Sequence, residues 1–430
     1  MSDNKTPARP FDPHRRPATP ALRDLVQEVM QQLEAYETCH GLRKRRRSVQ
    51  AQATHAETVA AIVCDLIYRE LEHPGGRVHV SQSHQVLRKA SRYKGKAMGK
   101  TLPDVLKVLS APEMNVIQLV PGKPGFTGKD EGWTFTVKGK QTVMTAGSKL
   151  LSRIASFGIS FADIGRSEGE EILLLRGAKD RNDRPGPLVE YTDTEETLRL
   201  RQDLKCINDW LQQADIECNY SSVNSKDRRL RRIFNNADFG QGGRLYGGFW
   251  QAMSGTERLN SLSIEDDSCA ELDYGQTGLL LLYAQDGEEP PKGDLYDLSA
   301  YGIPETCRPG VKKVLQAAIN ASKPLDRLPQ GSRKTIPKRI TLTRLKAALH
   351  QRHPAIAHRF GTGVGLTLMR KEADILVDVL LALKDRNITA LPVHDAVLVN
   401  GNHDQDAQEV MIQVFRKHTG LVPDVSITYP

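Results

Sequence analysis

The sequence predicts an α+β fold with more than one domain. With 430 residues the chain is too long for one small hydrophobic core. Beyond about residue 193, helical and strand-like patterns alternate to the C-terminus, which is an α+β signature. Before that point, helical patterns precede strand-like runs, as in a smaller α+β module.

Residues 1–52 are expected to form a basic, partly disordered segment. Before position 21, prolines stand among charged residues, a pattern typical of disorder. Helical periodicity then runs from Ala21 to about Tyr36, and a basic run, residues 43–47, follows.

Residues 53–165 are expected to form an α+β module that is winged-helix-like. Helical patterns near 59–71 and 102–109 precede strand-like runs at 116–120 and 133–137. The turn-rich loop 121–125 between these runs contains a lysine. Helices followed by a basic-tipped hairpin favour a DNA contact module, although any small α+β domain gives a similar pattern.

Charge and composition narrow the possible partners. The net charge of +8 is concentrated at 43–47 and 228–232, which favours a polyanion such as nucleic acid over the alternative of a solvated basic face. No apolar run approaches the ~18 residues of a membrane span, and the polar N-terminus is not a signal peptide. We therefore expect a cytoplasmic protein without membrane contact. The six cysteines form no C-x-x-C pair and are expected to be free thiols.

Two acidic positions carry the chemical signal. His394 and Asp395 lie within the apolar, strand-like run 391–399, where a carboxylate is costly unless a cation meets it. Asp273 ends a second strand-like run, 269–274, and an apolar helical run follows it. Two such aspartates brought together would hold the pair of Mg²⁺ ions used in phosphoryl transfer, with Mn²⁺ as the substitute. The alternative for both is an N-cap or turn aspartate, which suits Asp273, with a helix after it, better than Asp395.

Four segments in order resemble motifs of the family A nucleic-acid polymerases, which include DNA polymerase I and the phage-type RNA polymerases. Residues 273–279, Asp-Tyr-Gly-Gln-Thr-Gly-Leu, resemble motif A, and residues 308–312, Arg-Pro-Gly-Val-Lys, resemble the R-x-x-x-K of motif B. Residues 393–395, Val-His-Asp, resemble motif C. Residues 238–246 are similar to the D-W-R-G-R-V-Y segment of the RNA enzymes. The resemblance covers about residues 195–430.

The resemblance implies a right-hand polymerase, with palm, fingers and thumb, behind the N-terminal basic module. We expect a thumb-like region at 166–235, palm at 236–300 and 366–430, and fingers at 301–365. The N-terminal half contains no convincing acidic set for a proofreading exonuclease, so a minimal polymerase is expected.

Site roles follow from residue chemistry and from the resemblance. Arg308 and Lys312 lie one helical turn apart and would neutralise a triphosphate, unless they belong to a surface basic helix. His394 would steady the primer terminus or a metal ligand, with a satisfied core histidine as the alternative. Gln276 and Gly278 fall in the nucleotide site. The residues expected to contact nucleic acid are Arg231, Arg232 and Arg244, the last after two glycines that permit close backbone approach.

The chain departs from the family at three positions. The aromatic residue expected eight positions after the motif B lysine is Asn320. The glutamate that blocks a ribose 2′-hydroxyl in DNA polymerases falls at Gly278, which matches the RNA enzymes. Ala396 follows the motif C aspartate where a third acidic ligand can stand.

The sequence therefore predicts a monomeric nucleotidyltransferase, a DNA polymerase that extends a DNA primer-template with dNTPs. Synthesis of RNA from NTPs, by an RNA polymerase or primase-like enzyme, is the alternative. A non-catalytic DNA-binding replication protein is the alternative from another class.

Overall fold

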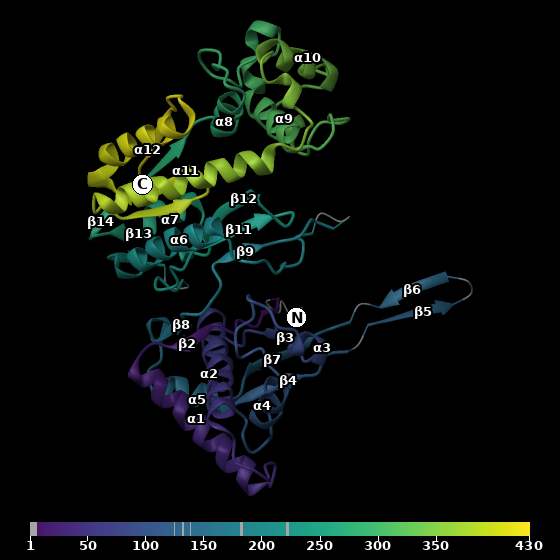
Figure 1. Ribbon diagram of the computed structural model, residues 1–430, viewed down its shortest axis with the longest axis vertical. Coiled ribbons are helices and arrows are strands. Elements are labelled where there is room, and N and C mark those ends of the chain that lie inside the picture. Colours follow the sequence, from purple (N-terminus) through teal and green to yellow (C-terminus); the bar gives the residue numbers. More distant parts are fainter. Residues whose placement is uncertain (1–6, 124, 131–132, 138, 181–183, 221–222) are drawn as a thin grey trace. The chain divides into compact units, whose positions relative to one another are not determined.

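The computed structural model describes residues 7–123, 125–130, 133–137, 139–180, 184–220 and 223–430, and gives only the backbone course over 126–130 and 133–137. The chain divides into two compact units, residues 1–171 with 220–227 (unit 1) and residues 172–219 with 228–430 (unit 2). Both combine helices with sheets, which confirms the α+β class (Figure 1). No helix in the described ranges is long and apolar enough to cross a membrane.

Unit 1 packs helices against a four-stranded sheet of order β1-β3-β7-β4. Its core lies mainly among α1, α2, α4 and this sheet. The helices are α1 (Pro20–Cys39), α2 (Val49–Glu72), α3 (His84–Arg88), α4 (Leu102–Leu109) and α5 (Ser148–Ser156). The strands are β1 (Arg9–Pro10), β2 (Arg15–Pro17), β3 (Val78–Val80), β4 (Ile117–Val120), β5 (Phe126–Asp130), β6 (Trp133–Val137), β7 (Thr142–Ala146) and β8 (Ile164–Arg166).

The two strands expected to form one hairpin have other partners. β4 pairs with β7, and β6 pairs with β5, in both cases antiparallel. The hairpin predicted between 116–120 and 133–137 is therefore wrong. Its missing partner, β5, contains Gly128, Lys129 and Asp130, which are depleted in strands and hide it from a propensity argument. Pro124, in the predicted turn, lies outside the described residues.

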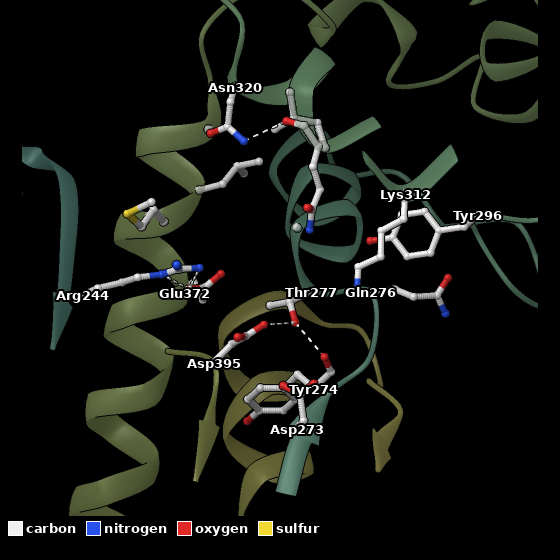
Figure 2. A pocket seen from close by; sticks show the side chains of 16 residues that line it. Arg244, Asp273, Tyr274, Gln276, Thr277, Tyr296, Lys312, Asn320, Glu372 and Asp395 are labelled. Carbon is white, nitrogen blue, oxygen red and sulfur yellow. Dashed lines mark hydrogen bonds and ion pairs between the residues drawn. The ribbon is translucent and has the colours of Figure 1, made fainter. Parts of the chain in front are cut away.

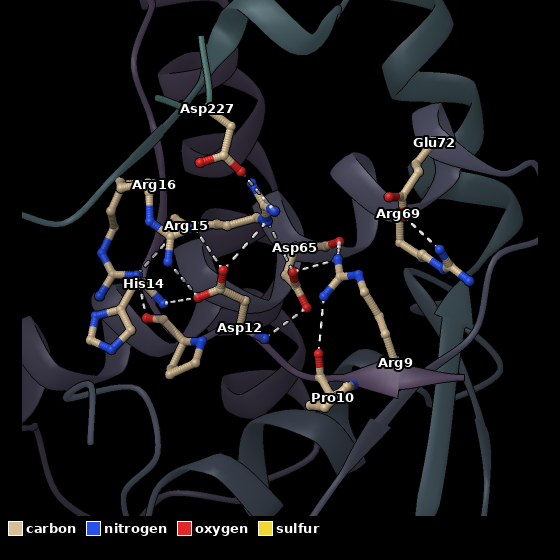
Figure 3. Close-up of polar contacts among 12 residues, drawn as sticks. Arg9, Pro10, Asp12, His14, Arg15, Arg16, Asp65, Arg69, Glu72 and Asp227 are labelled. Atoms are coloured by element: carbon tan, nitrogen blue, oxygen red, sulfur yellow. Dashed lines mark hydrogen bonds and ion pairs between the residues drawn. The ribbon is translucent and has the colours of Figure 1, made fainter. Parts of the chain in front are cut away.

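The disorder expected over residues 1–20 is also wrong for residues 7–20, while residues 1–6 lie outside the described part. β1 pairs with β3, and β2 pairs with β8. Asp65, fully buried on α2, binds Arg9 at 2.6 Å and Arg15 at 3.3 Å (Figure 3). The charges of Arg9 and Arg15, which suggested a solvated tail, thus have a partner distant in sequence.

Unit 2 contains a six-stranded sheet of order β10-β13-β14-β16-β15, in which β17 also pairs with β14, and a three-stranded sheet of order β12-β11-β9. The strands are β9 (Leu173–Leu175), β10 (Ile216–Cys218), β11 (Arg231–Asn235), β12 (Asp238–Tyr246), β13 (Leu262–Ile264), β14 (Asp267–Tyr274), β15 (Ala390–Val393), β16 (Ala396–Asn400) and β17 (Val425–Thr428). The helices are α6 (Glu195–Gln213), α7 (Gly255–Ser261), α8 (Thr277–Asp286), α9 (Arg308–Asn320), α10 (Leu342–Arg352), α11 (Gly365–Asp385) and α12 (Asp404–Thr419).

Helix α11 connects the parts of unit 2. It packs against β12, α6, α8 and α12. Its apolar face, which includes Leu368, Leu376, Leu380 and Leu383, is buried. The first two turns of the helix, with Leu368 and Glu372, line the same cleft as Asp273 and Asp395. All six cysteines of the chain are free, as expected.

Candidate active site in unit 2

Asp273 lies at the end of the central strand β14. In the antiparallel pairing it stands opposite Ala396, the residue after Asp395. The next residue, Tyr274, is buried and its hydroxyl donates to the carbonyl oxygen of Met411 at 2.7 Å, which fixes this strand end. Asp273 does not cap α8, because the cap position is Gln276. The N-cap alternative for Asp273 is therefore wrong.

Asp395 occupies a tight turn and not the middle of a strand. β15 ends at Val393 and β16 begins at Ala396, so the continuous strand expected over 391–399 is wrong. His394 has a φ of 59°, in the left-handed region that such residues rarely adopt. The flanking strands are largely buried, which explains the apolar pattern around the turn. Residues 391–399 fold as a hairpin whose tip carries the carboxylate.

The two carboxylates line one cleft of about 270 Å³ (Figure 2). The hydroxyl of Thr277 lies 3.3 Å from a carboxylate oxygen of Asp395 and 3.2 Å from the carbonyl oxygen of Tyr274, and donates to either. Desolvation in the cleft, reinforced by the negative charges of Asp395 and Glu271, raises the pKa of Asp273 to about 6. The pair therefore repels itself and attracts cations.

A third carboxylate, Glu372 on α11, lines the same cleft. It accepts a hydrogen bond from Arg244 at 2.6 Å. Burial raises the pKa of Glu372 to about 7 against the attraction of Arg244, and the charges of Asp395 and Asp273 contribute to the rise. Sequence reasoning did not assign Glu372 to the site, because its only signal is its place on an amphipathic helix.

One cation enters the cleft from α9. Lys312 lines it, and the Lys312 ammonium lies 5.8 Å from the ring centroid of Tyr296, a second lining residue. The Arg308 guanidinium lies 5.4 Å from the same ring, so both cations share a face as expected. Arg308 itself is not among the lining residues and is paired with Asp294. The structure thus brings Lys312 to the cleft, with Arg308 behind it.

Both other residues expected at the nucleotide site also line the cleft. The side-chain oxygen of Gln276 accepts from the backbone N–H of Leu295 at 2.5 Å, which ties down the loop that carries Tyr296. A Cβ placed at Gly278 meets no atom within 4 Å. Asn320, the departure in motif B, lines the cleft as well. No local pattern in the sequence indicated Tyr296.

His394 stands at the exposed tip of the hairpin and is not a satisfied core histidine. Its ring lies edge-on to Tyr246, with 6.3 Å between the ring centroids. Desolvation is the main cause that lowers the pKa of His394, and Arg244 contributes. His394 is not among the residues that line the cleft, although it directly precedes Asp395, which is.

The basic run 228–232 is mainly structural. Arg232 is 1% exposed, donates to the carbonyl oxygen of Gly243 and binds Asp374, both at 2.8 Å. Arg228 is 2% exposed and donates to backbone carbonyl groups at the end of α6 and beyond. The nucleic-acid contact expected for Arg232 is therefore wrong, because its guanidinium is occupied inside the unit. Arg231 is half-buried on β11.

The glycines before Arg244 serve internal packing. Gly242 and Gly243 have φ values of 85° and 83°, and a Cβ at Gly243 would lie 2.9 Å from the Phe234 ring. The close approach that they permit is to β11. Arg244 itself points toward Glu372 at the cleft (Figure 2).

The cleft fits magnesium better than a metal held by protein alone. Among the residues that the structure describes, no three His, Cys, Asp or Glu side chains form a group that could hold a metal ion. Magnesium commonly binds one or two carboxylates and completes its shell with water and substrate phosphates. Asp273 and Asp395 provide this donor set.

Neither the family models nor the curated protein sequences give a match to this chain. Among the solved structures, the chain is similar to the POL domain of Pol1 from M. smegmatis in complex with DNA primer-template and dNTP, at a TM-score of 0.32 and 13% sequence identity. The similarity covers 59% of this chain and 57% of that chain, so the chain spans little more than half of its neighbour.

Proposed function

We propose that unit 2 catalyses template-directed nucleotidyl transfer, in which a primer 3′-hydroxyl attacks a nucleoside triphosphate and pyrophosphate leaves. One observation carries the proposal. Asp273 and Asp395, from separate strand ends, line the same cleft as Lys312, and their mutual repulsion contributes to a pKa of about 6 for Asp273. Two carboxylates opposite a cation are what a triphosphate with its metal ions requires.

Asp273 and Asp395 are the proposed metal-binding residues. Two Mg²⁺ ions, or Mn²⁺ in their place, supply activation of the 3′-hydroxyl and neutralisation of the triphosphate when bound. Backbone strain near both carboxylates supports a binding role, because Gln276, three residues after Asp273, and His394, directly before Asp395, have φ values of 61° and 59°. Unfavourable backbone of this kind persists where the surrounding structure enforces it, and it is concentrated at functional sites.

The wall formed by α9 is the proposed triphosphate site. Lys312 supplies the positive charge, and the ring of Tyr296 holds its ammonium through a cation–π contact at 5.8 Å. Arg308 reinforces the positive potential from behind while paired with Asp294. Gln276 and Gly278 border the space left for the sugar.

Arg244 is the proposed contact to the primer-template. Glu372 holds the Arg244 guanidinium at the cleft through a 2.6 Å bond, so that its remaining N–H groups can reach a nucleic-acid strand. His394, at the tip of the neighbouring hairpin, is placed to steady the primer terminus. Arg231 is retained as a peripheral contact.

The proposed architecture is a right hand without a proofreading exonuclease. The β14–β16 pairing and α11 form the palm, α9 and α10 the fingers, and α6 the thumb-like region. Unit 1 is the N-terminal basic module. The domain boundaries at residues 52, 165, 235, 300 and 365 remain predictions.

DNA is the first product that we propose, and RNA is the second because Gly278 leaves open space where a side chain would exclude a 2′-hydroxyl. A non-catalytic binding protein has no need to keep two carboxylates in a cleft against their repulsion. The test is an extension assay on primed and unprimed templates, with dNTPs and NTPs supplied separately. Extension of primed DNA with Mg²⁺ is expected, and no incorporation on any template with Mg²⁺ or Mn²⁺ would refute the proposal.

A further inference from the structure

Unit 1 contains a helix and strand order of the winged-helix kind. The order is α2, β3, α3, α4, β4, β7, and β3, β7 and β4 form adjacent antiparallel strands of the sheet. The β5–β6 hairpin is inserted between β4 and β7 (Figure 1). One helix, one strand, two further helices, and two strands with a hairpin inserted between them form a winged-helix arrangement. Helix α4 stands in the place of the second helix, which enters the DNA major groove in helix–turn–helix modules, but its connection to α3, residues 89–101, is longer than the 3–4-residue turn of those modules.

The segment from α3 to α4 is strongly basic. Between residues 88 and 107 it contains seven lysines and arginines and one acidic residue, Asp104. Three of the cations have partners inside the unit. Arg92 binds Glu171 at 3.2 Å, Lys94 donates to the Leu87 carbonyl oxygen, and Lys96 lies 3.4 Å from Glu57.

The remaining four cations are exposed and have no ion-pair partner among the described residues. They are Arg88, Lys89, Lys100 and Lys107. Two lie at or next to the end of α3, one precedes α4 and one is on α4. Cations concentrated on the α3–α4 segment, with Asp104 as its one acidic residue, match a polyphosphate backbone.

The base of the hairpin adds a second observation. Lys123 and Lys140 stand directly opposite each other in a β-bridge, joined by backbone hydrogen bonds of 2.9 and 2.8 Å. Both side chains are exposed. Like charges at opposed positions destabilise a strand pair. A phosphate between the two ammonium groups would remove this repulsion.

We infer that unit 1 binds double-stranded DNA through the α3–α4 segment and the base of the β5–β6 hairpin. A duplex fits better than a single strand, because single-strand sites stack bases on aromatic side chains. The only aromatic residue between 88 and 107 is Tyr93, which is partly buried. The inference uses residues of unit 1 alone and does not depend on the activity proposed for unit 2.

The test measures binding of the full-length chain to a duplex closed at both ends by hairpin loops, which offers no primer terminus to unit 2. One variant replaces Arg88, Lys89, Lys100 and Lys107 by alanine. The matched variant replaces four consecutive exposed cations of the α1–α2 connection, residues 43–46, by alanine and so removes the same charge. Fluorescence anisotropy across a salt series gives the slope of log K against log salt for each protein.

Each phosphate contact contributes about −0.9 to that slope, so the slope of the α3–α4 variant is expected to be less steep by about 3 to 4 and its binding weaker. The residue 43–46 variant is expected to change the slope by less than 1. Circular dichroism checks that both variants fold.

Three results would overturn the inference. The first is a wild-type protein that does not bind the closed duplex. The second is an equal or larger loss of slope in the residue 43–46 variant. The third is wild-type binding to single-stranded DNA or RNA that is at least as tight as binding to the closed duplex, together with an equal loss of affinity for the single strand in the α3–α4 variant.

Discussion

A glutamate placed at Gly278 is expected to create discrimination against NTPs. Gly278 is the second residue of α8, its φ is not positive, and a Cβ there meets no atom within 4 Å. The substitution therefore fits without strain and removes a glycine from a helix, which by itself stabilises by up to about 1 kcal/mol. The new side chain fills the space that we assign to the sugar 2′-position.

The expected magnitude comes from overpacking. Forcing one extra oxygen against a filled wall costs about 1–3 kcal/mol, or roughly 5- to 150-fold in rate. The ratio of kcat/KM for dNTP over NTP should rise by this factor in Gly278→Glu, whereas wild type discriminates weakly. The assay is single-nucleotide extension of one primer with matched dNTP and NTP.

Gly278→Gln is the control for charge. It has nearly the same shape and should raise the ratio equally, because repulsion between a carboxylate and the triphosphate affects both substrates alike. A wild-type enzyme that already rejects NTPs strongly, or a Gly278→Glu variant with an unchanged ratio, would refute this reasoning and place the sugar gate on another residue.

Three further predictions concern the cleft. Lys312→Ala should raise KM for the nucleotide roughly 10- to 100-fold, since a charged hydrogen bond contributes about 1.5–3 kcal/mol. Lys313→Ala, on the same helix, should change this KM little. Equal effects of the two substitutions would remove Lys312 from the site. Because the pKa of Asp273 is about 6 without metal, the rate of nucleotide incorporation should fall as the pH drops through about 6 and the carboxylate takes up a proton. A higher Mg²⁺ concentration should move the midpoint of this pH profile to lower pH, because Mg²⁺ competes with the proton. A midpoint that does not respond to Mg²⁺ would contradict this. Mg²⁺ should raise the Tm of wild type and not that of Asp273→Asn, as scanning calorimetry would record; equal shifts would place the metal elsewhere.

Sequence reasoning succeeded where the pattern is local. The helix at 102–109 and the strand that ends near Asp273 depend on periodicity and neighbouring residues, and the structure has them at or near the expected positions. The pairing of β14 with β16 then brings Asp273 next to Asp395. The two acidic runs, far apart in the sequence, thus become neighbours in the sheet.

The remainder depends on contacts between residues far apart in sequence. The basic run around Arg232 suggests a surface cation, but Arg232 is buried and forms an ion pair with Asp374 on α11. Tyr296 lies in an irregular loop, and bonds of that loop to residues distant in sequence, including Gln276 and His353, place its ring in the cleft. Asp65 and its two arginine partners order the N-terminal segment. Charge composition records none of these pairings.

Single-turnover primer extension by Asp273→Asn and Asp395→Asn tests the central proposal most directly. Asp209→Asn on α6, an exposed position of unit 2, is the matched control. A neutral amide is a poor ligand for Mg²⁺, so both cleft variants should lose about 10³-fold or more in rate while primer-template affinity and the Asp209→Asn rate stay near wild type. Extension at a near wild-type rate by either cleft variant would contradict the assignment of these carboxylates to a two-metal site.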